Sequence, residues 1–232
     1  MSHQRLRPLV KSEHDAKRDA SLQIVRRIDW RFLLPNPHLG RIAYMGGPCD
    51  ALSEALNQFS ESLTLIAPID QAEHAQSNLS DFELVVIRSR RIADAAKAHE
   101  MLMDGGHLYW EIDRFGGLLP LHRSTRGVGW QAHWALHSLR HYLRTLERLG
   151  FCNIGIYWHR PSFENCHEII PLQEQSVLTY VFSRNHEGLA ASIALAAGHL
   201  LLKTGWLSRL VPCLSIVACK VACKHVSSGA IV

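Results

Sequence analysis

Long apolar runs are scarce in this chain of 232 residues, and so is cysteine. The first twenty residues contain no apolar stretch that could serve as the core of a signal peptide. The most apolar stretch, residues 188–202, ends at Lys203, short of the roughly 20 residues that a membrane span requires. The six cysteines are too few and too irregularly spaced for a disulfide framework. We therefore expect a cytoplasmic protein with reduced thiols and no transmembrane span.

An excess of charge is also missing from most of the chain. The formal net charge is +4, and residues 1–31 hold eight basic and four acidic side chains, which leaves the remainder balanced. A nucleic-acid-binding domain usually spreads a basic face over its folded surface, so this distribution disfavours a nucleic-acid partner. A hydrophobic content of 47% is enough for a sizeable core. We predict a basic N-terminal arm over residues 1–28, one domain over 29–220 and a flexible tail over 221–232.

Within the domain, short apolar runs alternate with helical stretches, which is the pattern of βα units in a parallel sheet. The predicted strands cover residues 41–45, 63–66, 82–87, 107–112, 151–158 and 213–219, and the predicted helices cover 50–59, 92–103 and 131–149. A helical insertion is expected over residues 162–210, before the last strand. The fold class that follows is α/β, an abbreviated doubly wound sheet with a C-terminal helical insertion.

The predicted helix 131–149 has an apolar face and a basic face. Three histidines, His133, His137 and His141, follow one another at a spacing of four residues, which could place two of them on a metal ion. The arginines beside them would oppose a cation, so a solvated face or an anionic partner accounts better for the pattern. The cysteines near the C-terminus do not form a convincing zinc site either, and we predict no metal.

Several segments resemble the class I S-adenosylmethionine-dependent methyltransferases. Residues 81–86, Asp-Phe-Glu-Leu-Val-Val, are similar to the fourth strand of that family, and residues 101–108 are similar to the Gly-Gly passage that leads into its fifth strand. Residues 146–158 resemble its last helix, Gly-Phe turn and sixth strand, and 213–219 would supply its antiparallel seventh. The resemblance implies S-adenosylmethionine as cofactor and a small metabolite or a glycan precursor as substrate.

The cofactor half of the chain departs from the family pattern. The family has an acidic residue and a glycine-rich turn after the first strand, where this chain has Tyr44, Gly46, Gly47 and Pro48. Fifteen residues separate Ile66 from Phe82, too few for the helix, strand and helix that usually fill this gap, so one strand and one helix are expected to be missing.

The resemblance implies a cofactor site in spite of these departures. Its candidate residues are Gly46 and Gly47 in the turn, Asp70 for the ribose, and Ile87 and Arg88 at the end of the strand after the short gap. The turn matches the family pattern only in part, but its glycines would still let a ligand approach the backbone closely.

Three polar residues are candidates for catalysis because they end predicted strands. The carboxyl ends of parallel strands are where open α/β sheets bind their ligands. Glu111 and Asp113 could orient an acceptor or take its proton, and His159 could act as a general base. The alternatives are a pair of solvated carboxylates and a histidine hydrogen-bonded in a loop.

Three functions remain open. The first is methyl transfer from S-adenosylmethionine to a small metabolite or glycan precursor, in which positioning would supply most of the catalysis. The second is a non-catalytic methyltransferase-like protein that has lost cofactor binding and acts as a binding or scaffold protein for a protein partner. The third is peripheral membrane contact through the basic arm and residues 189–210.

Overall fold

The computed structural model describes residues 21–47, 50–66, 81–113, 139–184, 196, 200 and 211–221. In these residues a sheet of seven strands runs in the order β2-β1-β3-β4-β7-β5-β6. Its strands are β1 (Leu39–Met45), β2 (Ser60–Leu65), β3 (Phe82–Arg88), β4 (Leu102–Asp113), β5 (Phe151–Arg160), β6 (Glu168–Pro171) and β7 (Cys213–Lys220). The predicted α/β class is confirmed.

Two strands of the sheet, β7 and β6, run in the opposite direction to the other five. β1, β2, β3 and β4 pair in parallel. β7 lies between β4 and β5 and is antiparallel to both of them, as predicted for the last strand. β6, which the sequence did not reveal, adds an antiparallel edge to β5.

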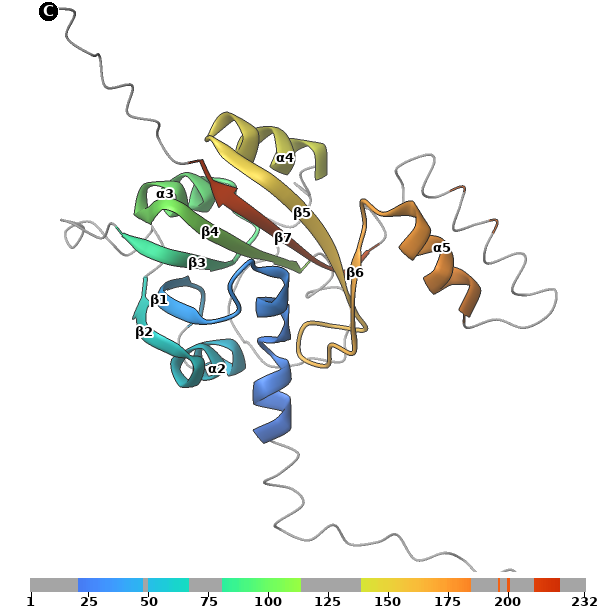
Figure 1. The fold of residues 1–232 in the computed structure, drawn as a ribbon, viewed down its shortest axis with the longest axis horizontal. Coiled ribbons are helices and arrows are strands. Elements are labelled where there is room, and N and C mark those ends of the chain that lie inside the picture. Colours follow the sequence, from blue (N-terminus) through green and yellow to red (C-terminus); the bar gives the residue numbers. More distant parts are fainter. Residues whose placement is uncertain are drawn as a thin grey trace, which may run out of the picture.

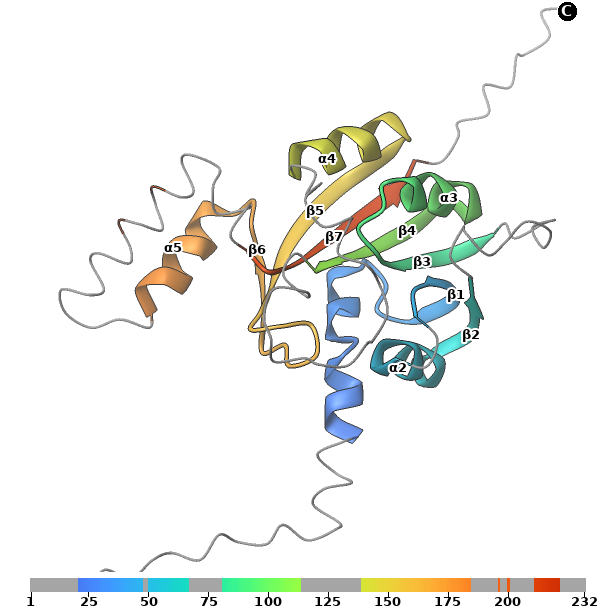
Figure 2. The same cartoon turned by 180° about the vertical axis from the view of Figure 1, so that it is seen from behind.

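Helices cover both faces of the sheet, and Figures 1 and 2 show them from opposite sides. One face carries α3 (Ala93–Met101) and α4 (Leu139–Arg148), whose buried residues join one apolar cluster. The other face carries α2 (Ala51–Phe59) and residues 21–34, which join a second cluster. α5 (Gln175–Arg184) lies beyond β6, at the far edge from β2 (Figure 1). The sheet is therefore doubly wound, as expected.

The periodicity of the sequence explains which helical faces are buried. In α4, Tyr142 and Leu146 are buried, and Leu139 and Leu143 are partly buried against the same cluster. α2 begins at Asp50, whose carboxylate accepts a hydrogen bond from the amide of Ser53 at 2.7 Å. Residues 131–138 of the predicted long helix lie outside the described residues.

The N-terminal boundary differs from the prediction. Residues 21–26 are helical, a 3-10 turn covers Asp29–Leu33, and Arg27, Ile28 and Trp30 are buried. Mixed charge without a clear period had suggested an arm up to residue 28, but the apolar contacts of this segment come from only a few side chains. The domain therefore includes residues before 28. The proposed tail lies outside the described residues, apart from residue 221.

Residues 67–80, which make up most of the short gap after β2, lie outside the described residues, so the missing strand and helix stay a prediction. Among the described residues β2 pairs with β1 alone. Of the proposed insertion 162–210, the structure describes β6 and α5, while 185–210 lie outside the described residues except for 196 and 200. In the described part of the chain, no helix is long and apolar enough to cross a membrane.

Candidate functional site

The carboxyl ends of β1, β3, β4 and β5 meet at one edge of the sheet, together with the beginning of β7. This is the edge at which open α/β sheets bind ligands. Polar side chains from all five strands gather there. They form one connected network rather than an open set of groups.

The first part of the network fills the turn after β1. The hydroxyl of Tyr44 donates to Oδ2 of Asp50 at 2.6 Å, and a guanidinium nitrogen of Arg88 donates to the same oxygen at 2.7 Å. The other oxygen of Asp50 caps α2 through the amide of Ser53. Both carboxylate oxygens are therefore engaged by the protein itself.

The charge state of Asp50 follows from these contacts. Burial raises the pKa of its carboxyl, but the hydrogen bonds from Tyr44, the Ser53 amide and Arg88 outweigh burial and leave the pKa below its ordinary value. Burial and the bond to Asp50 raise the pKa of Tyr44. The two groups are thus held as carboxylate and neutral phenol.

The two candidate glycines have different surroundings. A Cβ placed on Gly46 would lie 2.2 Å from the hydroxyl oxygen of Tyr44, so the tyrosine ring already lies against this part of the backbone. A Cβ on Gly47 would meet no atom within 4 Å. Pro48 and Cys49 lie outside the described residues. The side chain of Tyr44 therefore occupies the space that the missing Cβ of Gly46 leaves beside the backbone.

The second part of the network is a buried ion pair. The two guanidinium nitrogens of Arg27 donate to the two carboxylate oxygens of Glu111, each at 2.6 Å, and both side chains are at most 3% exposed. Tyr109 donates to Glu111 at 3.1 Å and stacks on Trp30, with ring centroids 3.7 Å apart. Glu111, a candidate catalytic residue, is thus bound on both oxygens and shielded from solvent.

His159, the candidate base, is 2% exposed. Its Nε2 lies 2.7 Å from Oγ of Ser215, and its Nδ1 lies 3.5 Å from Sγ of Cys166. Burial and the positive charge of Arg27 lower the pKa of the imidazole to about 3. The ring is therefore neutral and inaccessible, and it is a poor proton acceptor at neutral pH.

A loop between β5 and β6 covers the network. Phe163 is buried against the ring of His159, with centroids 4.8 Å apart, and lies under the guanidinium of Arg27. Glu164 accepts a hydrogen bond from Arg88 at 2.9 Å. Side chains of the loop thus contact three members of the network, His159, Arg27 and Arg88.

Three further candidates are Ile87, Asp113 and Asp70. Ile87 is fully buried in the apolar core. The backbone carbonyl of Asp113 accepts a hydrogen bond from Arg90, and the side chain is partly exposed at the end of β4. Asp70 lies outside the described residues. Of the predicted residues, Gly46, Arg88, Glu111 and His159 come together in or beside the network.

Sequence reasoning missed most of the partners of these residues. Arg27 was assigned to an arm, and Asp50 was read only as the start of a helix. One signal was available: Tyr109 and Glu111 are two residues apart in a strand, so they lie on the same face. Nothing in the sequence pointed to the positively charged partner of that face.

The described residues do not fit S-adenosylmethionine. Tyr44 lies over Gly46, where the family brings its cofactor close to the backbone, and Arg88 and Tyr44 occupy the Asp50 carboxylate at the start of α2. Binding would require the buried Tyr44 ring to leave the core and the Asp50–Arg88 pair to break.

No protein-family model matches the chain, and no curated protein matches it. A methyltransferase structure from Thermotoga maritima, described as a possible histamine N-methyltransferase, is 12% identical and covers 90% of this chain and 96% of that one, with a TM-score of 0.43. Phosphoethanolamine N-methyltransferase 2 of Haemonchus contortus is 13% identical over 88% of this chain and 52% of that one, with a TM-score of 0.42. A tRNA (m1A58) methyltransferase of Aquifex aeolicus is 9% identical over 92% of this chain and 71% of that one, with a TM-score of 0.38.

The order and direction of the strands assign the fold without these likenesses. Four parallel strands lie in the order β2-β1-β3-β4, and a reversed β7 is inserted between β4 and β5. Among the described residues, this reversed strand beside a parallel half is the arrangement expected from the resemblance. The fold is an abbreviated, doubly wound sheet of the Rossmann-like methyltransferase type.

Proposed function

We propose that the chain is a non-catalytic, methyltransferase-like binding protein that has lost S-adenosylmethionine and acts through contacts with a partner protein. The observation that carries the proposal is the cluster of Tyr44, Asp50 and Arg88 in the turn after β1. Tyr44 stands where the family has a carboxylate, and its ring covers Gly46.

The candidate catalytic groups support the same proposal. The negative charge of Glu111 is balanced by the positive charge of Arg27, and the imidazole of His159 is neutral and buried. A general base must reach the proton that it removes, and neither group is accessible. A fold does not fix an activity, so the methyltransferase-type sheet is compatible with a protein that only binds.

Calorimetric titration with S-adenosylmethionine and S-adenosylhomocysteine tests the proposal. We expect no binding of either ligand up to ~1 mM, a concentration at which an interaction is worth about 4 kcal/mol. A ligand-dependent rise in melting temperature provides a second, independent readout.

A variant and an alternative outcome sharpen the test. Tyr44→Asp/Arg88→Ala removes the ring from Gly46 and the cation from Asp50, and a gain of weak binding in this variant would show that the cluster is what blocks the site. Micromolar binding by the unaltered protein would overturn the proposal. It would favour methyl transfer to a small metabolite or glycan precursor instead.

A further inference from the structure

The outward face of α4 carries three arginines in one row. Arg140, Arg144 and Arg148 are exposed and four residues apart, so they follow one another about 6 Å apart along the helix axis. The opposite face of the helix, with Tyr142 and Leu146, is buried against the sheet. The arginine row therefore points away from the core.

Among the described residues, these arginines have no carboxylate partner, whereas several other arginines do. Carboxylates pair with four arginines elsewhere, namely Arg27, Arg88, Arg160 and Arg184. Among the residues that the structure describes, no ion pair involves the three arginines of α4. Their charges remain available to a second molecule.

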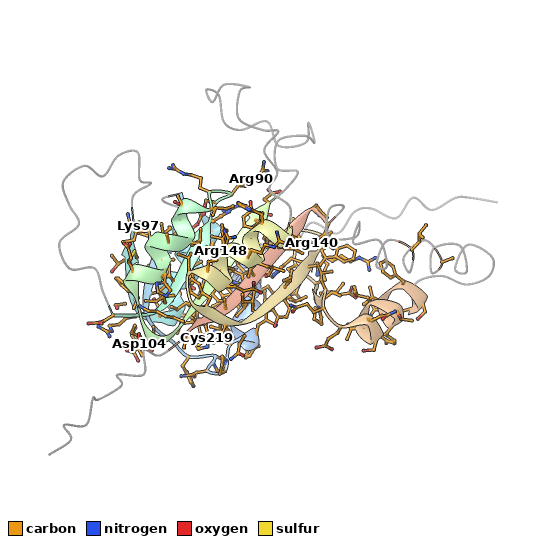
Figure 3. The ribbon with its side chains drawn as sticks, turned by 90° about the horizontal axis from the view of Figure 1, so that it is seen from above. Arg90, Lys97, Asp104, Arg140, Arg148 and Cys219 are labelled. Carbon is orange, nitrogen blue, oxygen red and sulfur yellow. The ribbon has the colours of Figure 1, made fainter. Side chains whose placement is uncertain are left out.

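The neighbouring helix does not widen this surface. Figure 3 looks onto the layer of α3 and α4, where Lys97, Arg140 and Arg148 lie on the same side of the sheet. The ammonium of Lys97, however, is buried, and within the described part of the chain it has no hydrogen-bond partner. The exposed basic row is therefore confined to α4 on this side of the described structure.

The sequence shows the same segregation of charge. Residues 114–148 contain six arginines, no lysine and a single acidic residue, Glu147. The other parts of the chain hold 19 basic and 20 acidic residues, so this stretch carries more than the whole net charge of +4. A charge concentrated in this way is typical of a surface that meets an anionic partner.

The character of the surface favours an acidic protein segment. Arginine forms bidentate pairs with carboxylates and is enriched in protein interfaces, whereas lysine is depleted there. A membrane would also require apolar side chains beside the cations, and none of the exposed large hydrophobic residues of the described chain lies on α4. A nucleic acid would favour a basic field wider than one helix, and the rest of the chain carries no excess of positive charge.

We propose that the outward face of α4 docks an acidic helical segment of a partner protein, whose carboxylates recur every helical turn opposite Arg140, Arg144 and Arg148. This inference rests on the proposed function, in which the chain has lost its cofactor and acts through contacts with a partner protein. Charge complementarity supplies the specificity, and the encounter weakens as salt rises.

The test uses the full chain and a synthetic helical peptide with glutamate at every fourth position, followed by fluorescence anisotropy. We expect the peptide to bind at low salt and its glutamine counterpart to bind at least tenfold more weakly. Arg144→Glu/Arg148→Glu should weaken binding of the glutamate peptide at least tenfold. The control Arg26→Glu/Arg41→Glu changes the net charge equally at two exposed residues outside α4 and should change binding less than about twofold.

Other outcomes overturn the inference. An equal loss in both double variants would show attraction by net charge alone, and absence of peptide binding up to ~1 mM would remove the docking surface. Tighter, α4-dependent binding to vesicles with anionic phospholipids or to duplex RNA would assign the face to a different class of partner. If S-adenosylmethionine binds while the peptide result holds, the proposed function fails and the docking surface stands.

Discussion

Glu111 and Arg27 form a buried ion pair, so two opposite charges are removed from water and each one compensates the other. We expect Glu111→Gln to lower the free energy of unfolding by about 3–5 kcal/mol, because it leaves the buried guanidinium without an opposite charge. Urea denaturation followed by circular dichroism measures the loss.

Two further variants test whether the stability lost in Glu111→Gln depends on the burial of the ion pair or only on the loss of a charge. Asp104→Asn weakens a contact 4.0 Å long between a half-exposed carboxylate and Lys220, and it should cost less than about 1 kcal/mol. Arg27→Met/Glu111→Leu removes both buried charges and should recover most of the stability lost in Glu111→Gln. A small effect of Glu111→Gln, similar to that of Asp104→Asn, would mean that water reaches the pair.

The imidazole of His159 makes stability depend on pH. Its pKa is about 3 in the folded protein and about 6.5 when unfolded, so between these values the unfolded chain binds the proton more tightly. Stability contributed by the neutral ring is present above pH 6.5 and is lost as the pH falls towards 3. Between pH 7 and pH 5 we expect the protein to lose about 2 kcal/mol more than the His159→Gln variant. Parallel pH profiles of the two proteins would contradict the assigned burial.

Gly46 and Gly47 provide a matched pair of substitutions. Gly46→Ala places a Cβ against the hydroxyl of Tyr44, so it should displace the ring, weaken its bond to Asp50 and destabilise the protein by about 1–3 kcal/mol. Gly47→Ala meets no neighbour and should stay within about 1 kcal/mol of the unaltered protein. Thermal unfolding without any ligand measures both. Similar melting temperatures for the two variants would show that Tyr44 does not pack on the turn.

At the scale of elements, the N-terminal segment is part of the domain. Deleting residues 1–27 removes Arg27 and the helical residues 21–26, and it leaves Glu111 buried without its cation. We expect a loss of at least about 3 kcal/mol in the free energy of unfolding. Deleting residues 1–20 keeps Arg27 and the helical residues 21–26 and serves as the control. Equal stability of the two truncated proteins would restore the interpretation of residues 1–27 as an arm.

The sequence predicted those elements whose pattern is local. The alternation of strands and helices and the apolar face of α4 follow from periodicity within short windows, whereas the reversed last strand was implied by the family resemblance. β6 was missed because four residues are too few to show a period. The N-terminal segment was missed because three buried side chains, Arg27, Ile28 and Trp30, fix it in place while its remaining residues look like those of an exposed arm.

The site was harder to predict than the fold because its contacts join residues that are far apart in the sequence. Glu111 and Arg27 are 84 residues apart, and His159 and Ser215 are 56 apart. A single sequence locates each candidate at a strand end but does not show whether its partner is a ligand or another side chain. Of the eight candidate residues, four lie in or beside the network, and other side chains of the protein contact them: Gly46, Arg88, Glu111 and His159.

At the scale of the whole molecule, the connections between strands are uneven in length. The four strands of one half, β1 to β4, follow one another in the sequence and are joined by short crossovers. The apolar faces of this half are covered by α2, α3 and residues 21–34. The other half depends on β5, which has no direct pairing with β4. Among the described strands, only β7 joins the two halves through hydrogen bonds between strands.

That placement of β7 constrains the order in which the protein can be assembled during synthesis. β5 and β6 leave the ribosome before β7 does, yet they have no place in the finished sheet until residues 213–220 have been translated and inserted. Until then the nascent chain exposes the open edges of β4 and β5, which can pair with other chains. The second half of the sheet therefore folds late, and chaperones that shield unpaired strands should matter most during translation of the last strand.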